Sequence, residues 1–145
     1  MADIREISPS DTAQIAEAIL ELRPRWKTEA ALVDFIDGTL RPTGYRLVGA
    51  FEPGSDTAAA ALGFRRLAST AWGWYLYVDD LSTLPRARGR GHADALLQWV
   101  AEEARRSDCE AIHLDSGVGA DRAPAHRLYM RHRLRISAHH FQGDI

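Results

Sequence analysis

The sequence predicts a mixed α/β fold in a single domain over residues 1–145. The first observation is that segments with apolar residues at helical spacing alternate with short β-branched or aromatic runs. The second is the length of 145 residues, which is typical of one domain. The third is the composition, 46% hydrophobic and 26% charged, which suits a globular protein with a sizeable core. The expected order is β-α-α-β-β-β-α-β-α-β around a central sheet.

The N-terminal part is expected to form one strand and two helices. A short strand at 3–7 precedes a helix that begins after Ser8, a good N-cap residue. Apolar side chains share one face of that helix, namely those of Ile15, Ala18, Ile19 and Leu22. The second helix is predicted over 28–38, with Thr28 as its N-cap and Gly38 at its end.

Strands dominate the middle of the chain. Two strand-like runs at 45–52 and 57–68 flank the turn sequence EPGSDT, which favours a hairpin. The aromatic and β-branched run at 72–84 predicts a long central strand. The remaining elements are a helix at 91–106, a strand at 111–116, a helix at 123–132 and a last strand at 135–141.

The bulk composition excludes several classes of protein. Eighteen basic and 20 acidic residues give a net charge of −2, which argues against general binding to nucleic acid or anionic membranes. No apolar run reaches the roughly 20 residues of a membrane span. The N-terminus lacks the basic and apolar regions of a secretory signal. Cys109 is the only cysteine, so no internal disulfide can form, and a cytoplasmic location is expected.

The sequence RARGRG joins the predicted central strand to the helix at 91–106. The first turn of a helix has unpaired N–H groups and a partial positive charge. Glycine lets the backbone approach a ligand closely, and arginine binds phosphate in a bidentate manner. The junction therefore predicts an anion site that suits a pyrophosphate. The alternative is a solvated loop with a glycine cap.

Two common phosphate motifs fit this junction poorly. A P-loop is excluded because the chain has no Gly-Lys pair. A dinucleotide fingerprint is matched by Gly89 and Gly91, but its third position is Asp94, which would crowd the strand and repel a phosphate. Asp115 could take the part of the ribose-binding acid. A dinucleotide-binding protein therefore remains a weaker alternative.

The pattern [QR]-x-x-G-x-[GA] is matched in full by Arg88, Gly91 and Ala93. On this motif, on DLSTLPRARGRGHADALL at 80–97 and on APAHRLYMRHRLRI at 123–136, the sequence resembles the GNAT superfamily of acyl-CoA-dependent N-acyltransferases. The expected element order is also similar to that of the superfamily over nearly the whole chain.

One departure concerns the end of the helix at 123–132. The superfamily usually has Gly-Phe where this chain has Arg133 and Leu134. Glycine would adopt the left-handed conformation cheaply, whereas arginine needs about 1 kcal/mol or more. A different helix end is therefore expected here.

The resemblance implies an acetyl-CoA-dependent N-acetyltransferase that transfers the acetyl group to a primary amine by direct attack in a ternary complex. It implies that the fourth and fifth strands splay apart and that the coenzyme passes between them. It also implies two sets of coenzyme-binding residues. Around the pyrophosphate these are Arg88, Gly89, Arg90, Gly91, His92 and Ala93, and along the pantetheine arm they are Leu81, Ser82 and Thr83.

Tyr129 matches the tyrosine that many superfamily members use as general acid. A phenol has a reference pKa of about 10, so it is protonated at neutral pH and can donate to a departing thiolate. The alternative is a core tyrosine, because it shares a helix face with Ala125, Leu128 and His132.

Asp79 and Asp80 are adjacent on the central strand, so they are expected to point to opposite faces unless a bulge intervenes. A carboxylate on a covered face is costly unless it is used or paired. Asp80 is in phase with the apolar set Trp74, Leu76 and Val78. We therefore assign Asp80 as the base or the amine-binding acid. The alternative is that both acids bind nearby arginines.

No metal site is expected. The chain has no Cys-x-x-Cys or His-Glu-x-x-His motif, and its histidines lack the i, i+4 spacing of helical ligands. Cys109 has no base beside it in the sequence and is expected to be a small buried hydrophobic residue.

The acceptor amine stays open among a polyamine, an amino acid, an aminoglycoside-like drug and a protein lysine or N-terminus. An aromatic wall for a cation could come from Trp26, Trp72, Trp74, Tyr75 and Tyr77, which equally suit a core or a homodimer contact. An acidic acceptor could instead meet Arg23, Arg25 and Lys27. A non-catalytic acyl-CoA sensor or partner module is the alternative to an enzyme.

Overall fold

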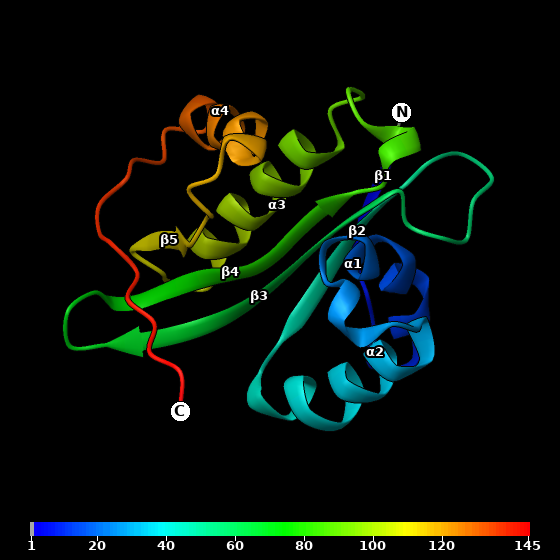
Figure 1. The fold of residues 1–145 in the computed structure, drawn as a ribbon, viewed down its shortest axis with the longest axis horizontal. Helices are drawn as coiled ribbons and strands as arrows, with labels where there is room; N and C mark the ends of the chain where they lie inside the picture. Colours follow the sequence, from blue (N-terminus) through cyan, green and yellow to red (C-terminus); the bar gives the residue numbers. More distant parts are fainter. Residues whose placement is uncertain (1) are drawn as a thin grey trace.

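The computed structural model of the protein describes residues 2–145 and contains one five-stranded sheet between two layers of helices (Figure 1). The strands lie in the order β1-β2-β3-β4-β5, and only the β4–β5 pair is parallel. They are β1 (Asp3–Glu6), β2 (Arg46–Phe51), β3 (Ala60–Ser69), β4 (Gly73–Thr83) and β5 (Ala111–Leu114). The predicted mixed α/β class is therefore confirmed.

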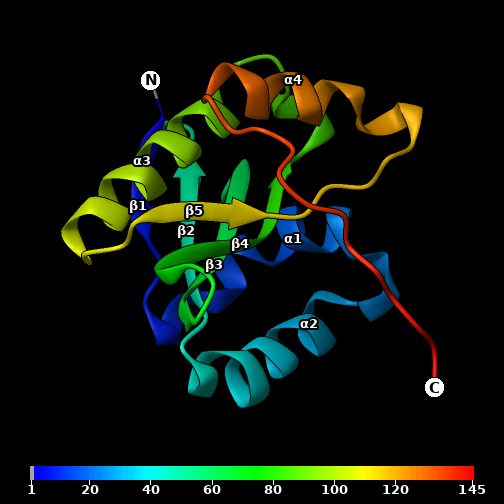
Figure 2. The same cartoon turned by 90° about the vertical axis from the view of Figure 1, so that its left-hand side faces the viewer.

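The helices cover both faces of the sheet. Figure 2 shows α1 and α2 on one face and α3 and α4 on the other. The main helices are α1 (Ala16–Leu22), α2 (Glu29–Phe35), α3 (His92–Arg106) and α4 (Ala123–Arg131). Short turns of 3-10 helix precede or join them, namely η1 (Pro9–Ile15), η2 (Pro24–Trp26), η5 (Pro85–Ala87) and η6 (Ala120–Arg122).

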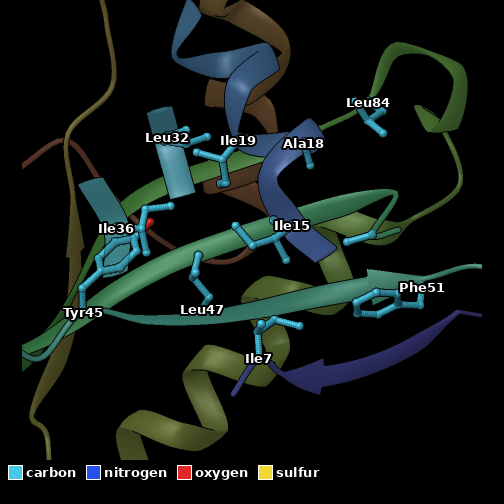
Figure 3. Close-up of a cluster of buried hydrophobic side chains, with 12 residues drawn as sticks. Ile7, Ile15, Ala18, Ile19, Leu32, Ile36, Tyr45, Leu47, Phe51 and Leu84 are labelled. Carbon is cyan, nitrogen blue, oxygen red and sulfur yellow. The ribbon is translucent and has the colours of Figure 1, made fainter. Parts of the chain in front are cut away.

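Two apolar cores follow from this arrangement, one on each face of the sheet. The core under α1 and α2 includes Ile15, Ile19 and Tyr45 and is drawn in Figure 3. The core under α3 and α4 includes Phe64, Leu76, Val78, Leu96 and Leu128. Successive side chains of the central strands point alternately into one core and the other, because neighbouring residues of a strand face opposite sides of the sheet.

The first helices differ from the sequence prediction in detail. Ser8 occupies the N-cap position of η1, but its hydroxyl hydrogen-bonds to Asp11 and caps no backbone N–H. The chain then runs as η1 before it becomes α-helical at Ala16. Thr28 does cap α2, because its Oγ1 accepts from the backbone N–H of Ala31 at 3.1 Å.

The second helix does not end at Gly38. It continues through a π-helical turn, η3 (Ile36–Leu40), and a 3-10 turn, η4 (Arg41–Thr43), to Gly44, which has a φ of 99°. The buried Thr12 hydroxyl donates to Asp37 at 2.6 Å and accepts from Arg41 at 3.0 Å. These long-range contacts stabilise the extra turns, and helical periodicity alone does not reveal them.

The predicted last strand at 135–141 is wrong. Residues 134–145 contain no helix or strand, and in Figure 1 this segment runs away from α4 past the end of the sheet. Ile136 and Phe141 are 74% and 92% exposed. A strand needs a hydrogen-bonding partner strand and an apolar surface against which its side chains pack. Within the described part of the chain, Ile136 and Phe141 pack against no such surface. β5 likewise ends at Leu114 instead of residue 116.

The end of α4 takes the conformation that glycine would take, although the residue is arginine. Arg133 has a φ of 64°. Its N–H donates to the carbonyl of Met130 at 3.0 Å, and the N–H of Leu134 donates to the carbonyl of Tyr129 at 3.1 Å. These bonds satisfy the last carbonyls of the helix. The expectation of a different helix end is therefore wrong.

Within residues 2–145, no helix combines the length and the apolar character that a membrane crossing requires.

Candidate active site

A cavity of about 280 Å³ opens where β4 and β5 separate. Their parallel pairing runs from Tyr75 and Ala111 to Val78 and Leu114 and goes no further. The end of α1 and the start of α4 close the space beyond. Its charged and phenolic lining consists of Arg23, Asp79, Asp80, Asp115, Arg122 and Tyr129. The splayed strands expected from the sequence are therefore present, and titratable groups gather between them.

A β-bulge decides how the two adjacent aspartates point. Gly63 of β3 pairs with Asp80, whereas Phe64 pairs with Val78, so Asp79 is the extra residue of β4. Val78 belongs to the α3–α4 core. Asp80 nevertheless bonds to residues on the α1–α2 side. The phase argument that placed Asp80 with Leu76 and Val78 is therefore wrong, because it assumed a regular strand.

Asp80 is held by two donors. The Nε of Arg23 lies 2.8 Å from its Oδ1, and the hydroxyl of Tyr45 lies 2.7 Å from its Oδ2. Tyr45 is buried, and burial together with the Asp80 charge raises the pKa of its phenol well above 10. Tyr45 therefore stays protonated and remains a donor. Asp80 keeps further lone pairs for a ligand in the cavity.

Asp79 forms a bidentate ion pair with Arg65, at 2.9 Å from Nε and 2.7 Å from the second guanidinium nitrogen. Burial raises the pKa of Asp79, and the Arg65 hydrogen bond and charge offset part of this rise. Both aspartates thus bind arginines, as the structural alternative predicted. Both also line the cavity, so this pairing leaves a role in ligand binding open to them.

Tyr129 lies on α4 and packs beside the buried Leu128 while it lines the cavity. Burial raises the pKa of its phenol, and the nearby charges of Arg122 and Arg23 counteract part of this effect. The net rise keeps Tyr129 protonated through the neutral range. The side chain is therefore both a packing residue and a potential proton donor at the cavity.

Three residues of the cavity network escaped sequence reasoning. Asp115 accepts a hydrogen bond from Tyr77, whose pKa is raised by burial and by this carboxylate. The sequence suggests for Asp115 only the part of a ribose-binding acid. Arg122 precedes α4 and Tyr45 precedes β2, and neither lies in a motif. The one available signal was Gly63 in β3, because glycine inside a strand indicates a bulge or a close approach.

The junction between β4 and α3 has the backbone of an anion site. Gly89 and Gly91 have φ values of 78° and 82°, in the left-handed region that glycine favours. A Cβ at either position would meet open space, so the glycines are needed for conformation and the surface above them is free. α3 begins directly after Gly91, and the first N–H groups of a helix have no partner within it.

The arginines of this junction are neutralised by glutamates. Arg86 pairs with Glu17 at 2.7 Å, and Arg90 pairs with Glu52 at 2.6 Å. Arg88 lies 3.9 Å from Glu21, and its Nε donates to the carbonyl of Thr83 at 3.3 Å. The chain therefore relieves the repulsion within RARGRG by placing acids of α1 and of the β2–β3 loop beside it.

His92 and Asp94, both in the first turn of α3, have different surroundings. His92 is 6% exposed, and among residues 2–145 its Nε2 has no hydrogen-bond partner, although Glu52 Oε2 lies 3.4 Å away. Asp94 binds Arg131 at 3.2 Å and His132 at 2.8 Å on α4. It therefore points to α4, and the expected clash with strand and phosphate does not occur. His92 Nε2 is covered from solvent, and its nearest charged neighbour is Glu52.

Leu81, Ser82 and Thr83 form the free edge of β4. On one side they pair with residues 60–62 of β3, but β5 has already ended on the other side. Such an edge can pair with an extended ligand as a further strand would. Within the described part of the chain, no group of three or more His, Cys, Asp or Glu side chains is arranged to hold a metal ion.

The aromatic residues that the sequence left open between a cation-binding wall and packing contacts do not line this cavity. Trp26 stacks against Phe35, with ring centroids 4.3 Å apart. Trp72 stacks on His113 at 4.0 Å, and Arg66 lies over Trp74. None of the five aromatic residues proposed for the wall is among the side chains that line the cavity. The charged residues are therefore the ones that give the cavity its chemical character.

Comparison with known proteins places these features in a family. Residues 12–133 match the Acetyltransferase (GNAT) family. The chain is 28% identical over 123 residues to the uncharacterized N-acetyltransferase YhdJ of Bacillus subtilis, which covers 84% of this chain and 82% of that protein. It is 35% identical over 69 residues to the aminoalkylphosphonate N-acetyltransferase of Salmonella typhimurium. That match covers 48% of this chain and 42% of the relative, less than half its length.

A solved structure shows the same fold. An aminoglycoside N-acetyltransferase in complex with CoA superposes with a TM-score of 0.81 at 14% identity, over 100% of this chain and 95% of that chain. The fold is therefore shared even where the sequences have diverged. Because the family match spans most of the described chain, including the β4–α3 junction and α4, this protein belongs to the GNAT family of acetyltransferases.

Proposed function

We propose that the protein transfers an acetyl group from acetyl-CoA to a primary amine by direct attack in a ternary complex. The observation that carries this proposal is the cavity between the separated ends of β4 and β5, which both Asp80 and Tyr129 line. A free strand edge and an anion-binding helix start lie next to it in the chain. The Salmonella relative is by name an N-acetyltransferase, which supports the same reaction class.

The proposed coenzyme site follows the chain from β4 into α3. Gly89 and Gly91 leave the backbone open to a pyrophosphate, and Arg88 and Arg90 can exchange their glutamate partners for phosphate oxygens. The edge at Leu81–Thr83 offers backbone groups to the pantetheine arm. The coenzyme supplies an acetyl group activated as a thioester.

Asp80 and Tyr129 are proposed to handle the protons. An amine arrives mostly as ammonium, and the Asp80 carboxylate can anchor it and receive its proton directly or through water. Tyr129, protonated in this environment, donates a proton to the departing sulfur. Arg23 and Tyr45 hold the Asp80 carboxylate in place, so they act as positioning residues.

Coenzyme selectivity is the direct test of the donor. Calorimetry should show that CoA and acetyl-CoA bind much more tightly than NAD. Gly91→Glu should abolish the binding, because it adds bulk and negative charge at the phosphate position. Gly44→Glu is the matched control, since Gly44 also has a positive φ and open space at its Cβ. Equal or tighter binding of NAD would replace the assignment with a dinucleotide site.

Catalysis needs a separate assay. A panel of amines with acetyl-CoA, followed by the release of free thiol, should reveal turnover with at least one acceptor. Binding of acetyl-CoA without thiol release from any amine would favour a non-catalytic acyl-CoA sensor.

A further inference from the structure

The charges around the cavity are paired except at two positions. Asp79 is paired with Arg65, and Asp80 is paired with Arg23. Asp115 accepts from the neutral Tyr77, with the ring of His140 3.6 Å away. Arg122 also lines the cavity, but among residues 2–145 no carboxylate oxygen lies within 4 Å of its guanidinium. The unpaired charges of the lining are therefore one of each sign, Asp115 and Arg122, and within the described chain the Arg122 guanidinium has no carboxylate in contact with it.

The position of Arg122 is well defined by its neighbours. It ends η6 directly before α4, and a Cβ added at Gly117 would lie 3.5 Å from its Cγ. The loop at Gly117 is tied to α4, because His126 Nε2 donates to the carbonyl of Gly117 at 2.8 Å and lies 3.1 Å from Ser116 Oγ. Ligand binding at Arg122 therefore needs little ordering of the backbone, and the side chain itself is the part that must be immobilised.

Arg122 and Arg23 both face the proposed reaction centre. Both side chains line the cavity together with Tyr129. Both charges lower the pKa of the Tyr129 phenol, which places the two guanidinium groups within electrostatic reach of it. A polyamine would place a second positive charge near Arg122, which no carboxylate of the described residues contacts, and like charges repel.

We propose that the acceptor is a small amine that carries a carboxylate or phosphonate a few bonds from its nitrogen. This inference rests on the proposed acetyl transfer and specifies its substrate class. Arg122 binds the acidic group, for which the planar guanidinium has a bidentate geometry. The ammonium faces the carboxylates of β4. Such a zwitterion matches both signs of charge in the cavity.

The test uses four primary amines in which the same two CH2 groups follow the nitrogen and only the group beyond them differs. They are β-alanine and 2-aminoethylphosphonate, which carry an acid, β-alaninamide, which is neutral, and 1,3-diaminopropane, which is cationic. We expect kcat/KM for the two acids to exceed that for β-alaninamide at least about tenfold, the effect of one charge-assisted hydrogen bond. 1,3-Diaminopropane should be the poorest acceptor.

Arg122→Gln should remove this preference. It should raise KM for the acids about tenfold and leave KM for acetyl-CoA unchanged, because the lost contact is to the acceptor. Arg127→Gln is the matched control, since Arg127 is an exposed arginine of α4, the helix that begins directly after Arg122. The inference would be overturned if β-alaninamide or 1,3-diaminopropane were the best acceptor. It would also be overturned if Arg122→Gln raised only KM for acetyl-CoA. Either result would leave the proposed acetyl transfer intact.

Calorimetry separates this inference from the proposed reaction. The acidic amines should bind to the protein–CoA complex, and Arg122→Gln should weaken that binding about tenfold. Binding of this kind without turnover would refute the proposed acetyl transfer and retain the acceptor site. Absence of both binding and turnover for the acidic amines would refute the acceptor class, and thiol release with other amines would then decide the reaction.

Discussion

The hydroxyl of Tyr45 donates a 2.7 Å hydrogen bond to Oδ2 of Asp80. The two residues lie 35 positions apart, one directly before β2 and the other in β4. The Tyr45 ring reaches Asp80 across Gly63, where any Cβ would overlap the phenol. Gly63 is also the residue that pairs with Asp80 at the bulge. Bulge, glycine and tyrosine thus form one unit that fixes the carboxylate.

Gly63→Ala should therefore damage both stability and activity. The added methyl group displaces Tyr45 from a buried position and breaks its bond to Asp80. We expect a loss of about 1–3 kcal/mol in the free energy of unfolding, measured by urea denaturation, together with lower turnover. Gly38→Ala is the control, since a Cβ there meets nothing within 4 Å. Equal stability of both variants would contradict the account of Gly63.

Asp80→Asn keeps the shape of the side chain and removes its charge. Turnover with the best amine should fall at least roughly tenfold, the low end of the effect of a lost acid–base group. Asp79→Asn should have a smaller effect, because Arg65 already occupies both oxygens of Asp79. Steady-state kinetics on the two variants distinguishes them. If Asp80→Asn left turnover unchanged while Asp79→Asn lowered it, the proposed role would pass to Asp79.

Tyr129→Phe tests the proton donor. The ring still packs in the α3–α4 core, so folding and acetyl-CoA affinity should stay nearly unchanged. Turnover should fall by about 10²-fold, equivalent to roughly 2.7 kcal/mol of barrier. Unchanged turnover would show that water or the substrate supplies the proton. Lower thermal stability with a merely parallel loss of activity would make Tyr129 a core residue only.

The pH profile of the wild-type enzyme gives a second measurement on Tyr129. The acid must be protonated to act, and burial raises its pKa above 10. Activity that depends on this proton is therefore fully present at neutral pH and is lost only as the pH rises through the raised pKa. We expect no alkaline decline from Tyr129 below about pH 10. A decline near pH 8 that disappears in Tyr129→Phe would contradict the direction of this shift.

Glu52→Gln should strengthen coenzyme binding. Glu52 pairs with Arg90 and lies close to His92, so it competes with a phosphate for both. Removal of its charge should lower Kd for CoA about two- to fivefold at low salt, the range that an exposed ion pair allows. Asp56→Asn, a change of the same charge in the same loop, should leave Kd unaltered. A weaker Kd in Glu52→Gln would show that Glu52 supports the site.

Glu103→Gln addresses stability and its pH dependence. Burial alone would raise the pKa of Glu103, but hydrogen bonds from Arg46 and Arg106 outweigh it and lower the pKa. Its stabilisation is therefore present above the unfolded pKa of about 4.3 and is lost as the pH falls through the folded value. We expect Glu103→Gln to cost about 0.5–1 kcal/mol at pH 7 and less at pH 3, in urea denaturation. The exposed Glu102→Gln is the control.

Local patterns predicted the parts of the fold that depend on local physics. The β4–α3 junction could be identified because glycines, arginines and a helix start lie within six residues of sequence, and Gly89 and Gly91 have the positive φ that glycine favours. The class of fold followed from periodicity together with length and composition. Tyr129 could be singled out because α4 carries a recognisable segment.

Features that depend on contacts between distant segments could not be predicted. The bulge at Asp79 is determined by the pairing with Gly63 and by the Tyr45 ring, neither of which a period of two reveals. Arg122 enters the site through the loop that His126 ties to α4. The sequence at 135–141 predicts a strand, but a strand also needs a partner to pair with, and a local sequence pattern cannot supply one.

The extra residue Asp79 shifts the alternation of side chains along β4. Before it, Val78 points to the α3–α4 core, and after it Leu81, Ser82 and Thr83 form the free edge of the strand. Substitutions on one side of the bulge can therefore accumulate without changing the direction of side chains on the other side. Deletion of Asp79 would restore a regular strand and exchange the faces to which Asp80 and Leu81 point. Divergent relatives should consequently vary in residue type along β4 far more readily than in its length.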